Sequence, residues 1–164
     1  MCVLMCDLLK LCEGMKVLEV GAGSGYHAAL CAEIVAPEEA SKKGHVYTIE
    51  RMKELVDFSR KNLERAGYGD RVTVILGDGT LGHPEAAPYD AILVTAAGPD
   101  IPKPLLDQLA RGGRMVIPVG RFYYSQTLVL VEKDEKGRVR KKDYGAVAFV
   151  PLVGEYGWNK PYLG

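Results

Sequence analysis

Three glycines at alternate positions follow a short apolar strand near the start of the chain. Residues 17–25 read Val-Leu-Glu-Val-Gly-Ala-Gly-Ser-Gly, and an alanine-rich segment of helical character begins at Tyr26. Glycines permit positive φ angles and a close approach of the backbone to a ligand, and a helix N-terminus offers unpaired N–H groups to an electron-rich group. The pattern therefore predicts a cradle for a nucleotide-like cofactor, built by Gly21, Gly23 and Gly25.

The glycine spacing and the residue before the glycines distinguish between cofactors. Dinucleotide-binding folds use Gly-x-Gly-x-x-Gly, whose third glycine packs the helix against the strand beside a pyrophosphate. Here that later position is Tyr26. The carboxylate of Glu19 suits a cationic ligand better than a pyrophosphate. S-Adenosylmethionine carries an ammonium and a sulfonium, so we favour it over NAD and keep a dehydrogenase as the weaker alternative.

Polar side chains also end the strands that follow. Glu50 ends the strand expected over 45–49, where its carboxylate would accept hydrogen bonds from both hydroxyls of a ribose. Alternatively, it is a solvated carboxylate in the first turn of the next helix, where its negative charge interacts favourably with the helix dipole. Asp78 stands between two glycines after the strand 72–76 and would accept from the amine of adenine, or serve as an ordinary turn residue. Ser24 is expected as a helix N-cap, as a contact to the carboxylate of the ligand, or as both.

The loop Thr95-Ala96-Ala97-Gly98 follows the strand expected over 91–95. Its small side chains would leave an opening beside a methyl donor, unless the loop simply requires small residues. The sequence indicates no other catalytic machinery: its three histidines form no evident triad, and it contains neither a Gly-x-Ser-x-Gly elbow nor a Walker lysine. Hydrolase and kinase functions are therefore excluded.

Alternating helices and strands are needed to position these residues. The apolar patterns predict a first helix ended by Gly14, strands over 16–20, 45–49, 72–76, 91–95 and 114–119, helices over 26–35, 52–66 and 102–109, and a final hairpin of 127–131 with 139–150. Such an order predicts a parallel sheet with right-handed crossovers and an antiparallel edge. Because the carboxyl ends of parallel strands share one edge, we expect residues 21–25, Glu50, Asp78 and Thr95 to meet there.

Length and charge limit the remaining possibilities. The 164 residues are expected to form a single domain, 1–164, with an N-terminal helix over 1–14, a cofactor-binding α/β core over 15–120, and a hairpin with a substrate-side tail over 121–164. Basic and acidic residues balance at 21 each, which argues against nucleic acid as a partner. No apolar stretch is long enough to span a membrane, and the apolar N-terminus lacks the basic residues of a signal peptide.

Four cysteines occur, at positions 2, 6, 12 and 31. They form no Cys-x-x-Cys pair, and no pair of histidines has metal-ligand spacing. Cys2 and Cys6 lie one helical turn apart and would hold a metal only with further ligands that the sequence does not indicate. We therefore expect buried free thiols, a cytoplasmic protein and no metal site.

With these motifs in place, the chain resembles the protein-L-isoaspartate O-methyltransferases, also called protein-β-aspartate methyltransferases, over nearly all of its length. The resemblance rests on Val-Leu-Glu-Val-Gly-Ala-Gly-Ser-Gly-Tyr at 17–26, Val-Tyr-Thr-Ile-Glu-Arg at 46–51, Asn-Leu-Glu-Arg-Ala-Gly at 62–67, Gly-Asp-Gly at 77–79, Pro-Tyr-Asp-Ala-Ile-Leu-Val-Thr-Ala-Ala at 88–97, Leu-Ala-Arg-Gly-Gly-Arg-Met-Val-Ile-Pro-Val-Gly at 109–120 and Val-Ala-Phe-Val-Pro-Leu at 147–152. The first group is shared by many class I methyltransferases, whereas the last two, with the loop 94–97, are particular to this family. The resemblance implies a Rossmann-like class I S-adenosylmethionine-dependent methyltransferase, with a mostly parallel twisted sheet and a C-terminal antiparallel hairpin.

The resemblance also implies a reaction and a set of site residues. The family methylates the α-carboxylate of L-isoaspartyl residues in damaged proteins and releases S-adenosylhomocysteine; the ester then collapses through a succinimide, which repairs the protein. Together with the residues derived above, the expected cofactor-binding set is Glu19, Gly21, Ala22, Gly23, Ser24, Gly25, Glu50, Asp78, Gly79 and Thr95. The residues expected to border the isoaspartyl peptide are Ala96, Ala97, Ile117, Pro118, Val147, Phe149, Val150 and Pro151.

One departure from the family pattern concerns the N-terminus. The family carries a Ser-x-Pro-His segment ahead of the first sheet strand, whose serine contacts the substrate carboxylate, and residues 1–5 of this chain align just after that histidine. The chain therefore resembles an N-terminally short form in which no catalytic residue is identified, and we expect its activity to be impaired. The alternative is a non-catalytic S-adenosylmethionine-binding domain. A monomer is expected, with a dimer through the exposed N-terminal helix as the alternative.

Overall fold

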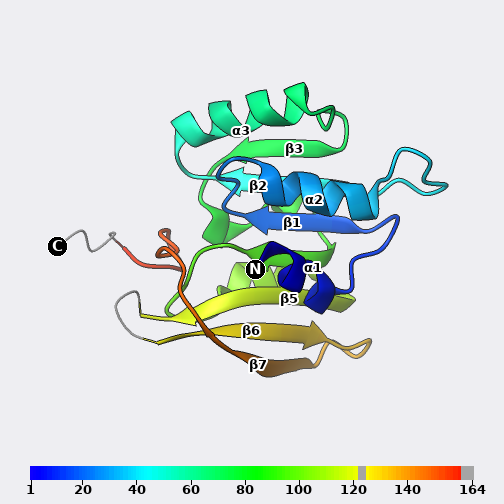
Figure 1. Ribbon diagram of the computed structural model, residues 1–164. Coiled ribbons are helices and arrows are strands. Elements are labelled where there is room, and N and C mark those ends of the chain that lie inside the picture. Colours follow the sequence, from blue (N-terminus) through cyan, green and yellow to red (C-terminus); the bar gives the residue numbers. More distant parts are fainter. Residues whose placement is uncertain (122–124, 160–164) are drawn as a thin grey trace.

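The computed structural model describes residues 1–121 and 125–159, and this part of the chain folds around one twisted sheet (Figure 1). The strands lie in the order β3-β2-β1-β4-β5-β6-β7. The elements are α1 (Cys2–Leu9), β1 (Lys16–Val20), α2 (Tyr26–Val35), β2 (His45–Glu50), α3 (Lys53–Arg65), β3 (Val72–Leu76), the short 3₁₀ helices η1 (Gly79–Leu81) and η2 (Pro84–Ala86), β4 (Tyr89–Val94), α4 (Lys103–Gln108), β5 (Leu109–Gly120), β6 (Gln126–Lys133) and β7 (Val139–Val147).

The pairing within the sheet confirms the predicted topology. The strand β1 pairs in parallel with both β2 and β4, and parallel pairing continues to β3 on one side and to β5 on the other. The last two pairings, β5 with β6 and β6 with β7, are antiparallel. The strand order therefore changes direction between β1 and β4, the place where open α/β sheets bind their ligands.

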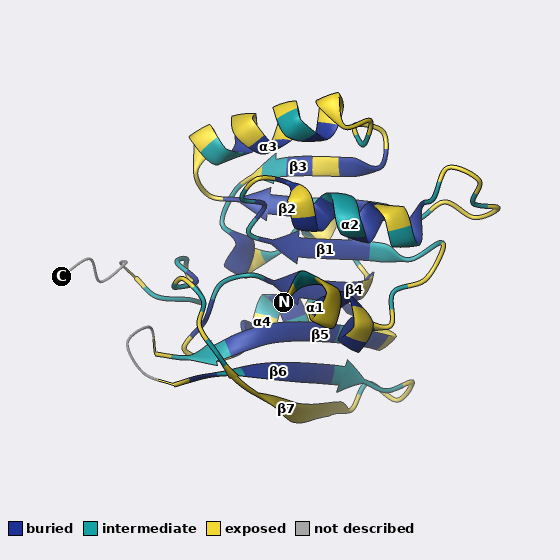
Figure 2. Ribbon diagram, in the orientation of Figure 1, coloured by how far each residue is buried: buried dark blue, intermediate teal, exposed yellow. Residues whose placement is uncertain are grey.

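Two hydrophobic cores fill the two faces of the sheet, because the side chains of the central strands alternate between them. The helices α1, α2 and α3 cover one face, and Val17 and Leu93 pack beneath them. The helix α4 covers the opposite face and packs through Leu105 against Leu18 and Ile92. Figure 2 shows the central strands buried over most of their length, as expected for parallel strands covered on both faces.

Several element boundaries differ from the sequence expectation. The strand β5 begins at Leu109 rather than at 114, directly after the six-residue helix α4. Its register with β4 shifts between Tyr89 and Ala91, and this irregularity accommodates the two glycines 112–113, which lie before the strand expected over 114–119. The strand β7 ends at Val147 rather than at 150, because the buried side chain of Gln126 binds the backbone of Phe149 through two hydrogen bonds of 2.6 and 3.0 Å.

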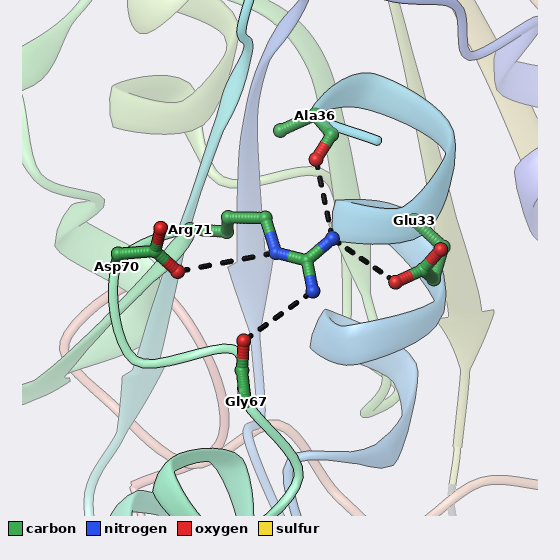
Figure 3. Close-up of polar contacts among 5 residues, drawn as sticks. All are labelled: Glu33, Ala36, Gly67, Asp70 and Arg71. Atoms are coloured by element: carbon green, nitrogen blue, oxygen red, sulfur yellow. Dashed lines mark hydrogen bonds and ion pairs between the residues drawn. The ribbon is translucent and has the colours of Figure 1, made fainter. Parts of the chain in front are cut away.

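A single arginine ties the helical layer to the start of β3. The Arg71 guanidinium donates from Nη1 to Glu33 Oε1 at 3.0 Å and to the Ala36 carbonyl at 3.3 Å, and from Nη2 to the Gly67 carbonyl at 3.3 Å (Figure 3). Its Nε lies 4.0 Å from Asp70 Oδ1. Arg71 therefore joins the end of α2 to the loop between α3 and β3.

The two edges of the sheet differ in exposure. The strand β3 at one edge is covered by α3, whereas β7 at the other edge is exposed from Val139 to Ala146 and half-buried only at Val147 (Figure 2). Within the described residues, every helix is too short or too polar to cross a membrane.

Candidate cofactor site

A cavity of about 610 Å³ opens at the carboxyl ends of β1, β2 and β4. This volume is in the range of small-molecule binding sites, and the position is the one where the strand order changes direction. The residues that line the cavity come from five segments far apart in the sequence: Val20, Gly21, Gly23, Ile49, Glu50, Arg51, Met52, Leu55, Gly79, Thr95, Ala96, Val150, Pro151, Leu152 and Val153.

The glycine loop forms one wall of the cavity and needs glycine at two positions for different reasons. Gly21 has φ +100°, and a Cβ there would lie 2.3 Å from Thr95 Oγ1, so any side chain would collide with the neighbouring strand end. Gly23 has φ +53°, and no heavy atom lies within 4 Å of the position a Cβ would take. The space over Gly23 is therefore open to a ligand that approaches the backbone, as the sequence predicted.

Glu50 lies at the end of β2 as expected and is 7% exposed. Its Oε2 accepts from the Gly23 amide at 3.3 Å, and its Oε1 accepts from the Met52 amide at 3.0 Å. A carboxylate offers about four lone-pair sites, so both oxygens retain capacity for further donors. Glu50 thus couples the glycine loop to the start of α3 and can still accept a pair of hydroxyl groups.

Glu19 is placed differently from our expectation. Its side chain is fully buried and does not line the cavity. Oε2 accepts from Thr48 Oγ1 at 2.5 Å, and Oε1 is a buried side-chain oxygen without a partner in the described structure. Burial raises the pKa of Glu19 to about 7. Because Glu19 shares its face of β1 with Val17, it points into the core beneath α1 and α2.

Asp78 also has a role that the sequence did not indicate. Its Oδ1 accepts from the amide and the hydroxyl of Thr80 at 2.9 and 2.7 Å, and its Oδ2 accepts from the Glu155 amide at 2.8 Å. The carboxylate does not line the cavity, whereas the neighbouring Gly79 does. Asp78 therefore anchors residues 153–158, and through them the segment 150–153, which forms another wall of the cavity.

The loop after β4 holds the same segment from the other side. Thr95 lines the cavity and its hydroxyl lies 3.0 Å from both the Val20 and the Gly21 carbonyl. Ala97 is buried; its amide donates to the Val150 carbonyl, and its own carbonyl accepts from the Leu152 amide at 2.8 Å and from Trp158 Nε1 at 2.9 Å. The small residues of this loop thus let residues 150–158 pack directly on the end of β4.

Most of the remaining predicted residues lie outside the cavity. Ala22 is buried in the loop, and Gly25, not Ser24, occupies the N-cap position of α2. Ser24 and Gly25 line a neighbouring groove of about 470 Å³ between α2 and α3. Of the residues expected on the substrate side, Ala96, Val150 and Pro151 line the cavity, whereas Ile117, Pro118, Val147 and Phe149 are strand or core residues away from it.

Sequence reasoning missed several residues of the cavity wall, including Val20 and Ile49 near the ends of β1 and β2. Arg51, Met52 and Leu55 follow Glu50 through the first turn of α3, and Val153 follows the expected substrate-side tail. Met52 and Leu55 belong to the apolar stripe by which the helix over 52–66 was predicted, and such a stripe ordinarily faces the core. Met52 is 47% exposed, so this end of the stripe faces the cavity rather than the core.

Comparison with known proteins agrees with this arrangement. The family model for protein-L-isoaspartate(D-aspartate) O-methyltransferase matches residues 1–157. A protein-L-isoaspartate O-methyltransferase from Hyperthermus butylicus is 59% identical over 162 residues, which cover 98% of this chain and 67% of that protein. One from Thermococcus onnurineus is 54% identical over 160 residues, which cover 98% of this chain and 70% of that protein.

Solved structures show the same relationship. A protein-L-isoaspartate O-methyltransferase of 30% identity superimposes with a TM-score of 0.85 over 95% of this chain and 47% of that chain. The structure of such a protein from Plasmodium falciparum, in complex with S-adenosyl-L-homocysteine, has 28% identity and a TM-score of 0.78 over 92% of this chain and 70% of its own. The predicted Rossmann-like methyltransferase fold is thus confirmed, and the chain belongs to the protein-L-isoaspartate(D-aspartate) O-methyltransferase family.

Proposed function

We propose that this chain binds S-adenosylmethionine in the cavity at the carboxyl ends of β1, β2 and β4, and transfers its methyl group to the α-carboxylate of L-isoaspartyl residues. The observation that carries the proposal is the joint position of Glu50, Gly23 and Gly79 in one cavity of suitable volume. Membership of the family and the S-adenosyl-L-homocysteine in the Plasmodium relative support the choice of cofactor.

The cavity wall fits the chemical groups of this cofactor. The two oxygens of Glu50 would accept the ribose hydroxyls, which are donors that a carboxylate binds strongly. Ile49, Met52 and Leu55 offer apolar surface for a flat ring, and the open backbone at Gly23 admits a close approach. Asp78 is engaged by its own chain, so we assign Glu50 and not Asp78 as the main carboxylate contact.

The reaction requires little acid–base catalysis by the protein. When bound, S-adenosylmethionine supplies a methyl group activated by the positive sulfonium, which a substrate carboxylate, already ionised at neutral pH, can take up without a general base. The protein's part is to align the two groups and to exclude water. Thr95, fixed to two carbonyls of the glycine loop, sets the position of Ala96, and residues 150–153 shield the cavity from the opposite side.

We also propose that the protein works in the cytoplasm on isoaspartyl-containing peptides and proteins. The four cysteines are free thiols, the state that a reducing compartment maintains.

Methyl transfer from labelled S-adenosylmethionine to an isoaspartyl peptide, with the matching aspartyl peptide as control, tests the activity. We expect label only on the isoaspartyl peptide, in a base-labile ester. If the folded chain binds the cofactor but labels neither peptide, the chain acts only as an S-adenosylmethionine-binding domain.

Two variants test the cofactor site by calorimetric titration. Glu50→Gln should weaken binding by about 1–3 kcal/mol, roughly 5-fold to 150-fold, because it removes charge-assisted hydrogen bonds. Gly23→Val should abolish binding by filling the open space over the loop. Gly137→Val is the matched control, since Gly137 also has positive φ and no atom near its Cβ position but lies in the β6–β7 turn. Unchanged affinity in Gly23→Val would exclude this cavity as the site.

A further inference from the structure

Three side chains that could bind a metal ion meet beneath α1 and α2, away from the cofactor cavity. Cys6 Sγ lies 3.5 Å from His27 Nε2 and 3.9 Å from Cys31 Sγ. The three potential ligand atoms lie within 4.8 Å of one another, and all three residues are buried. Cys6 comes from α1, whereas His27 and Cys31 lie one turn apart on α2 and therefore share a face of that helix.

The two separations from Cys6 match the coordination sphere of a tetrahedral zinc ion, and His27 and Cys31 lie within 4.8 Å of each other. With about 2.3 Å from zinc to sulfur and about 2.0 Å to nitrogen, tetrahedral geometry separates two sulfur ligands by roughly 3.8 Å and a sulfur from a nitrogen by roughly 3.5 Å. The observed separations are 3.9 Å for Cys6 and Cys31 and 3.5 Å for Cys6 and His27. The side chains thus require little rearrangement to enclose an ion.

We propose that Cys6, His27 and Cys31 bind one Zn²⁺ ion, with the fourth coordination position open to a small ligand or to a carboxylate oxygen. Thiolate and imidazole ligands favour a thiophilic ion such as Zn²⁺ over Mg²⁺ or Ca²⁺, which prefer oxygen. The site contains none of the cavity residues, so its role is structural: it would join α1 to α2 across the sheet face.

The surroundings of the three residues support a cation there. Glu19 lies on the same face of β1, beneath the two helices, and its Oε1 is the buried oxygen that lacks a partner in the described residues. A dication among these ligands would compensate the buried carboxylate, which could bind it directly or act as the outer partner that metal sites commonly include.

The helix α1 would gain most from such a link. It is eight residues long, has no side-chain cap at its N-terminus, and exposes Val3 and Leu4 to solvent. Short helices depend on tertiary contacts for their stability, and a metal bound only by the folded state adds to those contacts. Zinc binding should therefore stabilise α1 in particular.

The test uses the full chain, reduced and stripped of metal with a chelator, and titrated with Zn²⁺ alone. We expect one ion bound per chain and a rise in the melting temperature of several degrees. Co²⁺ in place of Zn²⁺ should give thiolate-to-cobalt charge-transfer bands and intense visible bands of tetrahedral coordination. Absence of saturable binding at one equivalent, or a cobalt spectrum without thiolate bands, would overturn the proposal.

Variants identify the ligands. Cys31→Ser and His27→Gln should each lose the cobalt spectrum or weaken zinc binding at least tenfold. Cys12→Ser and His45→Gln are the matched controls, because Cys12 is exposed and His45 lies on β2, where its ring binds Thr73. Equal zinc affinity in all four variants would refute the assignment.

A measurement on the unmodified chain covers the case in which a variant fails to fold. Zinc should slow the alkylation of Cys6 and Cys31 and leave that of Cys12 unchanged, as followed by mass spectrometry of labelled peptides. Equal protection of all three thiols, or of none, would count against the site.

Discussion

At the scale of single residues, the alternation of side chains between the two faces of β1 determines where the carboxylate of Glu19 lies. Glu19 follows Leu18 and precedes Val20, which both face the core beneath α4, so Glu19 faces the opposite core. The composition of the motif suggested a contact to a cationic ligand. The structure instead buries the carboxyl group, with Thr48 as its hydrogen-bond donor and Oε1 without a partner among the residues that the structure describes.

This burial makes stability depend on pH. The folded state holds the Glu19 proton more tightly than the unfolded state, since burial raises the pKa from 4.5 to about 7. The stability contributed by the protonated form is fully present below about pH 4.5 and is lost as the pH rises through about 7, by up to about 3 kcal/mol. Glu19→Gln keeps a neutral side chain at every pH. Chemical denaturation of metal-free protein between pH 5 and 8 should therefore show that the free energy of unfolding of the variant rises relative to that of the parent as the pH rises. A constant difference between the two free energies would contradict the buried position of this carboxyl.

At the scale of elements, most boundaries could be predicted because each is set by local chemistry. The strand 16–20 and the strand 72–76 were predicted to the residue, since a glycine or a change of periodicity ends each one. Two predicted strand boundaries were wrong because each is set by a contact with a residue distant in the sequence. Hydrogen bonding by Gln126 ends β7 early, and pairing with β4 extends β5 to include residues 109–113. No local pattern in the sequence contains either contact.

Arg71 provides a test of how the helical layer is held. Its guanidinium is buried, with 7% of the residue exposed, and reaches three separate acceptors that a lysine ammonium cannot span (Figure 3). Arg71→Lys should reduce the free energy of unfolding by about 1–3 kcal/mol, because it leaves the buried Ala36 carbonyl without its donor. The control Asp57→Asn disrupts the exposed pair with Lys53 and should cause no measurable change in urea denaturation. A similar loss in both variants would show that the network adds nothing beyond a surface ion pair.

At the scale of the whole molecule, the cavity depends on segments that the sequence does not place together. Residues 21–25, Glu50, Asp78 and Thr95 were expected to meet at one sheet edge because parallel strands end there. Gly21, Gly23, Glu50 and Thr95 line the cavity at that edge, whereas the Asp78 carboxylate does not and the neighbouring Gly79 does. The first part of the wall formed by residues 150–153 was expected only through family resemblance, and Val153 was not expected. The cluster of Cys6 with His27 and Cys31 was not expected at all, because helix packing, and not spacing along the chain, brings residues 21 and 25 positions apart into contact.

The anchoring of that wall by Asp78 leads to a further prediction. Asp78→Ala removes the acceptor for the Glu155 amide and for Thr80, so amide hydrogen exchange in residues 153–158 should accelerate at least tenfold even without cofactor. Asp90→Ala is the matched control, because Asp90 accepts from the Lys16 amide at the start of β1, at the opposite end of the sheet. If exchange is unchanged in Asp78→Ala, this carboxylate is free for a ligand, as the sequence first suggested.

The wall contributed by residues 150–153 also determines at which stage of protein synthesis the cavity can form. A chain emerging from the ribosome presents its N-terminal half first, and β1, β2 and the glycine loop can pair before the last strands have been made. The cavity remains one wall short until residues 150–158 dock on Ala97 and Asp78. A cofactor that binds in this cavity would therefore stabilise the protein only at the last step of folding. It would bind the completed chain and would not stabilise earlier folding intermediates.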